Sequence, residues 1–134
     1  MKNWKEAMEH IKEHRKKHKD SLDHAVAGWR YALTTQPNFK YHLFLSFCAI
    51  FLGIAYQISA NEWLIIILMI TWGLAMEMFN TLSESLTDLI KKEYDQDAKI
   101  VKDVAAGMML VTAMGAAIIG GIIFIPRFIS CLTG

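Results

Sequence analysis

Residues 77–88 read E-M-F-N-T-L-S-E-S-L-T-D, and they continue an apolar run that is long enough to cross a membrane. Glu77, Asn80, Glu84 and Asp88 follow one another at i, i+3, i+7 and i+11. At about 100° per residue, these four side chains share one face of a single helix. Ionisable side chains inside a membrane helix are costly and indicate a functional site. We call these four residues the acidic stripe, and they predict a membrane helix with a functional face.

Working outward, the chain contains three long runs with almost no charge, over residues 39–58, 63–79 and 104–125. The 134 residues are 54% hydrophobic, more than a soluble domain of this size would hide in its own core. At about 1.5 Å per residue, each run covers most or all of a hydrocarbon layer about 30 Å thick. The sequence predicts an all-α membrane protein with transmembrane helices over about 39–58, 63–90 and 98–125.

The segment before the first run divides into two parts. Residues 1–20 are rich in Lys, His and Glu, and Trp4, Met8 and Ile11 give them a narrow apolar stripe. We interpret them as a basic N-terminal extension whose helix stops at Ser21, or as a helix followed by a second one capped there. Residues 21–36 predict an amphipathic surface helix that Pro37 ends or kinks. The membrane domain is then 21–134, with Asn61 as a plausible cap of the second span.

Lysine and arginine placement predicts the topology. Residues 1–40 hold nine of the fourteen, the connection 58–62 holds none, and the connection 91–102 holds four. The positive-inside rule places the N-terminus and the second connection in the cytoplasm. The basic N-terminus is expected to meet anionic lipid headgroups rather than nucleic acid.

The acidic stripe has two interpretations. Carboxylates one or two turns apart, with an amide between them, can hold a divalent metal ion through hard oxygen ligands, and a partly buried Glu77 can act as a general base. Alternatively, Glu84 and Asp88 are ordinary charges on a solvated helix end, and only Glu77 needs an explanation.

A second polar group begins the third run, where residues 98–103 read A-K-I-V-K-D. Lys99, Lys102 and Asp103 share a face near a helix N-terminus, which attracts phosphate, although lysines there also anchor membrane helices. The topology brings this group and the acidic stripe to one cytoplasmic surface. A metal, lysines and a carboxylate base are the equipment of phosphoryl transfer. No Walker motif or protein-kinase motif set is present.

Other patterns carry less weight. His10, Glu13 and His14 match a zinc-protease string, but no protease-sized domain surrounds them, so a basic surface segment is favoured. Cys48 and Cys131 lie in and beyond different spans and predict no disulfide. The small residues on one face of the third span, together with the polar face, favour a homo-oligomer; they are Ala113, Ala117 and Gly121.

The chain resembles the prokaryotic diacylglycerol kinase and undecaprenol kinase family of small membrane lipid kinases over about residues 21–126. The likeness rests on five motifs: G-W-R at 28–30, N-F-K at 38–40, E-W at 62–63, E-M-F-N-T-x-x-E-x-x-x-D at 77–88 and A-K-x-x-K-D-x-A-A-G at 98–107. It implies three transmembrane helices plus a surface helix, in a homotrimer with active sites shared between subunits. It also implies transfer of the ATP γ-phosphate to a lipid hydroxyl with Mg²⁺, in a bacterial inner or plasma membrane.

The resemblance also implies roles for residues. Glu77 would be the general base and Glu84 a metal ligand. Asn80, Lys102 and Asp103 would handle the nucleotide and its phosphates. Three further residues match positions near the site, namely Arg30, placed with the nucleotide-binding group, and Asp88 and Lys99 in support.

The chain departs from the family pattern at Gln36, where the family usually has an acidic metal ligand. Glutamine still offers a carbonyl oxygen but removes a negative charge. The residues around Lys102 and Asn38 look more like undecaprenol kinases than diacylglycerol kinases. Two alternatives remain: a relative that lost the reaction and acts as a membrane scaffold or regulator, and a small cation transporter.

Overall fold

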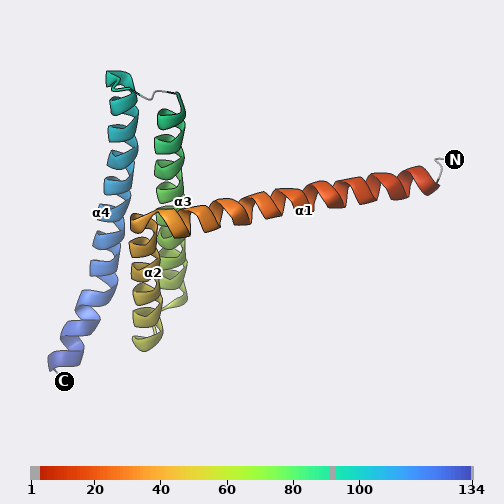
Figure 1. Ribbon diagram of the computed structural model, residues 1–134. Coiled ribbons are helices and arrows are strands. Elements are labelled where there is room, and N and C mark those ends of the chain that lie inside the picture. The colour runs from red at the N-terminus through yellow and green to blue at the C-terminus, as the bar shows by residue number, and fades with distance from the viewer. Residues whose placement is uncertain (1–3, 91–92, 134) are drawn as a thin grey trace. The chain divides into compact units, whose positions relative to one another are not determined.

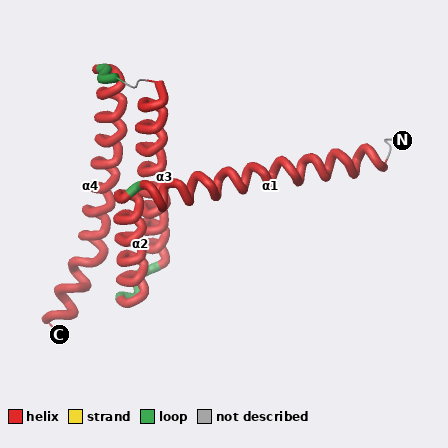
Figure 2. The backbone as a smooth tube through the Cα atoms, in the orientation of Figure 1, coloured by secondary structure: helices red, strands yellow, loops and turns green. Residues whose placement is uncertain are grey.

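The computed structural model describes residues 4–90 and 93–133. Within these ranges the chain forms four helices and no strand, namely α1 (Trp4–Thr35), α2 (Pro37–Ala55), α3 (Ala60–Ile90) and α4 (Gln96–Thr133) (Figures 1 and 2). The chain divides into two units, Met1–Thr35 with α1 and Gln36–Gly134 with α2 to α4. In the second unit, α3 packs along α4 and α2 packs along α3.

The α1 helix is continuous from Trp4 to Thr35, so the predicted break at Ser21 is wrong. A serine in a helix interior costs only about 0.5 kcal/mol relative to alanine, and α1 contains no proline. One helix of 32 residues, about 48 Å long at 1.5 Å per residue, therefore joins the basic extension to the predicted surface segment.

The break between α1 and α2 falls at Gln36, which is extended with φ −103° and ψ 109°. Pro37 causes this, because a proline ring disfavours the helical conformation of the residue before it. At the other end, α2 stops at Ala55, three residues before the predicted end. Gln57 has a φ of 50° and its N–H donates to Ile54 O (3.2 Å), while the N–H of Ile58 donates to Gly53 O (3.1 Å). This left-handed cap turns the chain toward α3.

A capping box begins α3. The hydroxyl and the N–H of Ser59 both donate to the Glu62 carboxylate, at 2.7 and 2.8 Å, and the Glu62 N–H lies 3.4 Å from Ser59 Oγ. Ser59 is therefore the cap, and the prediction of Asn61 is wrong because the spacing S-x-x-E closes the reciprocal pair. Glu62 also accepts from Arg127 of α4 at 2.9 Å.

The α4 helix is longer than predicted at both ends. Asp95 caps it by accepting from the N–H groups of Asp97 (3.0 Å) and Ala98 (3.1 Å), so it begins at Gln96 rather than Ala98. It runs through Pro126 to Thr133, past the predicted end at 125. Proline bends membrane helices without ending them, and α4 leans away from its earlier axis in this part (Figure 1).

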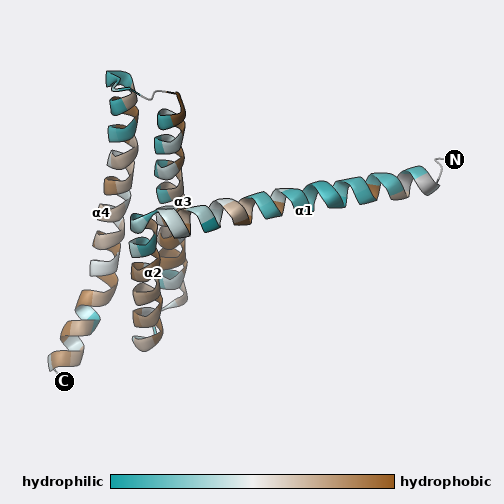
Figure 3. Ribbon diagram, viewed as in Figure 1, coloured by the Kyte–Doolittle hydropathy of each residue, from teal (hydrophilic) through white to brown (hydrophobic). Residues whose placement is uncertain are grey.

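Ile58, Ile66 and Ile123 form a small apolar core where α2 ends and α3 begins. Most other large apolar side chains of α2 to α4 are exposed, including Phe44, Phe51 and Leu64. Figure 3 shows apolar residues along most of these helices and polar ones where α3 ends and α4 begins. The three helices are long and apolar enough to cross a membrane. The predicted all-α membrane fold is thus confirmed.

Candidate active site

The acidic stripe runs along α3 from a buried end to an exposed one. Glu77 is 2% exposed and Asn80 is 7% exposed, whereas Glu84 is half-buried and Asp88 is exposed. Thr81 is also buried, and its hydroxyl donates to the carbonyl of Glu77 at 3.0 Å. Burying an unpaired carboxylate costs free energy that packing alone does not return. Asp88 therefore fits an ordinary charge on a solvated helix end, whereas the burial of Glu77 and Asn80 does not fit that description.

The side-chain amide of Asn80 donates a hydrogen bond but accepts none. Asn80 Nδ2 donates to Glu84 Oε1 at 3.1 Å, while Asn80 Oδ1 is buried with no hydrogen-bond partner in the described residues. Unsatisfied buried oxygens are rare in native proteins and call for an explanation such as an ion or a ligand.

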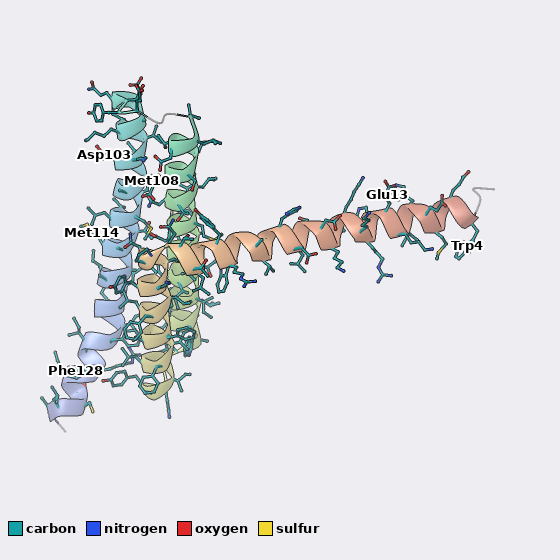
Figure 4. The ribbon with its side chains drawn as sticks, in the orientation of Figure 1. Trp4, Glu13, Asp103, Met108, Met114 and Phe128 are labelled. Carbon is teal, nitrogen blue, oxygen red and sulfur yellow. The ribbon has the colours of Figure 1, made fainter. Side chains whose placement is uncertain are left out.

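The start of α4 lies beside the end of α3. Lys102 donates to Asp88 across the two helices, so the predicted meeting of the two polar groups does occur, through this pair. On the neighbouring face of α4, Lys99 Nζ lies 2.6 Å from Asp103 Oδ2, and both side chains are exposed. Figure 4 shows Asp103 near the first turns of α4. The structure therefore pairs Lys102 with Asp88, one turn beyond Glu84.

Two residues of the expected site lie elsewhere in the chain. Arg30 is exposed on α1, in the unit Met1–Thr35. Gln36 is half-buried at the start of α2, and its side chain makes no capping hydrogen bond. Lys91 and Lys92, two of the four lysines in the predicted cytoplasmic connection, are outside the described residues.

A three-ligand metal site of His, Cys, Asp or Glu does not form anywhere in residues 4–90 and 93–133 for which side chains are described. The acidic stripe instead offers an amide oxygen with carboxylates on either side, namely Asn80 Oδ1 with Glu77 and Glu84. Hard oxygen ligands of this kind, with the orphaned Oδ1, fit a Mg²⁺ ion that keeps waters or phosphate oxygens as its other ligands.

Sequence reasoning missed an apolar groove between α2, α3 and α4, with a volume of about 320 Å³. Its α3 wall ends at Gly73 and Leu74, one turn before Glu77. Its α4 wall contains the small residues Ala113, Ala116, Ala117 and Gly120. The small-residue spacing was the available signal, but it was interpreted only as a helix-packing face.

Comparisons with known proteins agree with this geometry. The model of the prokaryotic diacylglycerol kinase family matches residues 23–124. The undecaprenol kinase of Bacillus subtilis is 36% identical over 107 residues, which are 80% of this chain and 87% of that protein. The diacylglycerol kinase of Synechocystis sp. is 34% identical over 113 residues, 84% of this chain and 65% of that protein. The chain therefore belongs to the prokaryotic diacylglycerol kinase family of membrane lipid kinases.

Proposed function

We propose that the chain transfers the γ-phosphate of ATP to the hydroxyl of a membrane lipid alcohol, with undecaprenol favoured over diacylglycerol. The observation that carries this proposal is the buried carboxylate of Glu77 beside the Asn80–Glu84 pair, at the end of the bundle where Lys102 meets Asp88. The undecaprenol kinase of B. subtilis, of which this chain covers 87%, supports the choice of acceptor.

Glu77 is the proposed general base. It takes the proton of the lipid hydroxyl as that oxygen bonds to the γ-phosphorus and the bond from the phosphorus to the ADP oxygen breaks. Its burial keeps water away from the reacting atoms, which limits hydrolysis of ATP. One turn on, Asn80 holds Glu84 through its amide N–H, and this contact orients the Glu84 carboxylate.

Glu84 and the unpaired Asn80 Oδ1 are the proposed ligands of Mg²⁺, with Gln36 as a further oxygen donor. When bound, the ion would neutralise phosphate oxygens of the nucleotide. Lys102 supplies positive charge for the phosphates, and Asp88 holds it toward α3. Asp103 contacts the nucleotide and is itself held by Lys99. Arg30, on α1, is the further nucleotide-binding residue that the family resemblance implies.

The proposed location is the plasma membrane of a bacterium, with the N-terminus in the cytoplasm. The excess of Lys and Arg in residues 1–40 and 91–102 supports this orientation. ATP would then reach the site from the cytoplasm and the lipid from the bilayer.

The alternative of an inactive scaffold has one supporting observation, which is glutamine at position 36. The alternative of a cation transporter predicts acids near the middle of the membrane. Glu77 instead lies about 26 Å along α3 from Ala60, near the far edge of a layer about 30 Å thick. The buried oxygens and nearby lysine favour the kinase.

The test incubates purified protein with labelled ATP and a panel of undecaprenol, diacylglycerol and other lipid alcohols. We expect phosphorylation of undecaprenol to be fastest. Glu77→Gln and Glu84→Gln should each lower turnover by about 100-fold or more, because each removes a group that contacts the reacting atoms or their metal. Glu93→Gln, an exposed carboxylate outside the helices, is the matched control and should leave turnover unchanged.

Three results would contradict the proposal. A wild-type protein that phosphorylates no lipid alcohol would favour the scaffold. Near-normal turnover in Glu77→Gln or Glu84→Gln would remove that residue from the site. Cation flux across vesicles that depends on Glu77, in place of phosphorylation, would favour the transporter.

A further inference from the structure

The α1 helix carries an apolar stripe in two stretches, and the first lies outside the part of the chain matching the family. Trp4, Met8 and Ile11 precede residue 23, where the match starts, and Leu22 and Val26 lie on the same line. At about 100° per residue these five side chains lie within an arc of about 60°. All five are exposed. Residues 12–21, between the two stretches, contain no apolar side chain, but because α1 is unbroken at Ser21 both stretches belong to one face of one helix.

Charged side chains of residues 6–20 are sorted around this stripe. Lysines border it on one side and histidines on the other; they are Lys12, Lys16 and Lys19, and His10, His14 and His18. The acids lie at the opposite pole, namely Glu6, Glu9, Glu13 and Asp20. Figure 4 shows Trp4 and Glu13 projecting from opposite sides of α1. Two of the border imidazoles, those of His14 and His18, have ring centroids 4.6 Å apart.

This order of apolar centre, cationic border and acidic pole matches the environments at a bilayer surface. Apolar side chains enter the boundary of the acyl chains, and lysines beside them extend their amines to phosphate groups. Acids on the far side of the helix stay in water, away from the negative surface. A duplex of nucleic acid offers no apolar layer for Trp4, Met8 and Ile11 to enter. At a bilayer surface Arg15, which lies on the line of the stripe, extends its guanidinium to lipid phosphate groups.

We propose that residues 4–20 form an anionic-lipid-binding surface that prolongs the predicted surface helix of residues 21–36. The lysine border supplies the attraction to the lipid phosphate groups.

The experiment measures the depth of two matched positions in the full-length protein. Cys48→Ser and Cys131→Ser give a background in which Ile11→Cys or Glu13→Cys carries a single fluorescent label. The protein is placed in nanodiscs of phosphatidylcholine, with or without phosphatidylglycerol, and EDTA is present throughout to remove metal ions. Brominated acyl chains quench a label in the bilayer, and acrylamide quenches a label in water.

With phosphatidylglycerol, we expect lipid quenching at position 11 and acrylamide quenching at position 13. Lys12→Gln should lower the ratio of membrane-bound to free segment about fivefold, since a basic residue near an anionic surface contributes that much. Lys17→Gln, which removes the same charge near the acidic pole, should change it far less.

Several results would overturn the proposal. Equal acrylamide quenching at both positions would mean that the segment lies in water. Protection of position 11 from both quenchers would mean that it docks on protein, such as a second copy of the chain. Lipid quenching without any need for phosphatidylglycerol, or an equal loss in Lys12→Gln and Lys17→Gln, would remove the role of anionic lipid. None of these readouts depends on kinase activity.

Discussion

At the scale of single residues, the Lys102–Asp88 pair links α4 to α3, and its exposure decides what it does. The two side chains are 39% and 66% exposed, so water and salt screen their attraction. Exposed ion pairs contribute about 0–1 kcal/mol to folding. We infer that the pair holds the ammonium of Lys102 in position rather than holding the two helices together.

This inference makes a prediction about three substitutions. Lys102→Met should lower kcat/KM for ATP by about 100-fold, because it removes a charge that contacts phosphate. Asp88→Asn should raise KM for ATP about tenfold or less, since the lysine stays but loses its position. Lys99→Met is the comparison variant, a lysine three residues away that holds Asp103, so its effect should be as small as that of Asp88→Asn and well below that of Lys102→Met.

Steady-state kinetics measure these effects, and thermal unfolding of each variant in detergent checks that folding changes by no more than about 1 kcal/mol. If Lys99→Met and Lys102→Met lost equal activity, the site would depend on the total charge of this region. The assignment of Lys102 as the phosphate contact would then be wrong.

The spacing of the acidic stripe was enough to predict that its four side chains share a face, because helical geometry alone sets that. It did not predict how burial falls from Glu77 to Asp88, since burial depends on which part of α3 is covered by other residues. Nor did it predict that Lys102 pairs with Asp88 and not Glu84. That choice depends on the register of α3 against α4, which no local pattern records.

At the scale of elements, the turn from α2 to α3 requires glycine at position 53. A Cβ atom built there would lie 2.8 Å from Trp63 Cη2 and 2.9 Å from Trp63 Cζ2, and 3.1 Å from Ile58 Cδ1. Trp63 also packs against the small core of Ile58, Ile66 and Ile123. The indole ring thus has core on one side and the backbone of α2 on the other, and it cannot move away without opening the core.

Gly53→Ala should therefore destabilise the fold by about 1–3 kcal/mol, the usual cost of overpacking, despite the helix propensity that alanine adds. Gly73→Ala is the control, since its Cβ meets nothing within 4 Å although Gly73 is also buried in a membrane helix. Unfolding in a mixture of detergent and denaturant measures both. If Gly53→Ala were more stable than the wild type, the Trp63 ring would not pack against Gly53 when the protein is in the membrane.

As part of the kinase proposal, we propose that the groove between α2, α3 and α4 binds the hydrocarbon chain of the lipid acceptor. It is apolar, it opens between membrane helices, and it ends one turn before Glu77. Ala116→Leu should fill part of it and raise KM for the lipid about tenfold while leaving KM for ATP unchanged, because one to two kcal/mol of apolar contact would be lost.

Ala75→Leu, the same substitution on an exposed position of α3, is the matched control and should leave both constants unchanged. Kinetics at varied lipid and fixed ATP, followed by the reverse, separate the two constants. An equal rise of both constants in Ala116→Leu would indicate a general distortion of the bundle and not a chain-binding groove.

Hydrophobic run length predicted the existence and order of the three membrane helices, because the thickness of a bilayer sets the length of an apolar helix. The ends were less accurate, for reasons specific to each. Gln57 takes a left-handed conformation that favours glycine, so the end of α2 carried no glycine signal. The third span was predicted to end at residue 125, but α4 continues through Pro126, because a proline in a membrane helix bends it without ending it. Ser21 was predicted to end one helix or cap the next, but α1 continues through it because no residue beside it breaks the helix.

At the scale of the whole molecule, a single chain leaves its site open. Lys102, Asp88 and Glu84 are exposed or half-buried, and the small residues of α4 line a groove with no helix in it among the described residues. Small residues on membrane helices favour close contact between helices. Together with the family's implied homotrimer, these features support sites that are completed by a neighbouring subunit.

Mixed oligomers test whether the site is shared. We predict that three chains assemble, measured as the mass of the complex in native mass spectrometry, and that Arg30 serves the site of a neighbour while Glu77 and Lys102 serve together in one chain. Inactive Glu77→Gln and Arg30→Gln proteins, mixed before assembly, should then recover about a quarter of wild-type turnover, because in a symmetric ring some sites receive both intact residues.

The matched mixture is Glu77→Gln with Lys102→Met. It should recover nothing, because α3 and α4 of one chain are joined through Asp88 and Lys102, so each site inherits a defect from one chain or the other. Separately assembled proteins mixed afterwards control for exchange of subunits. Recovery in the second mixture but not in the first would mean that Glu77 and Lys102 of one site come from different chains. The Lys102–Asp88 contact within one chain would then not belong to the working site. Recovery in neither mixture would mean that each chain forms its site alone.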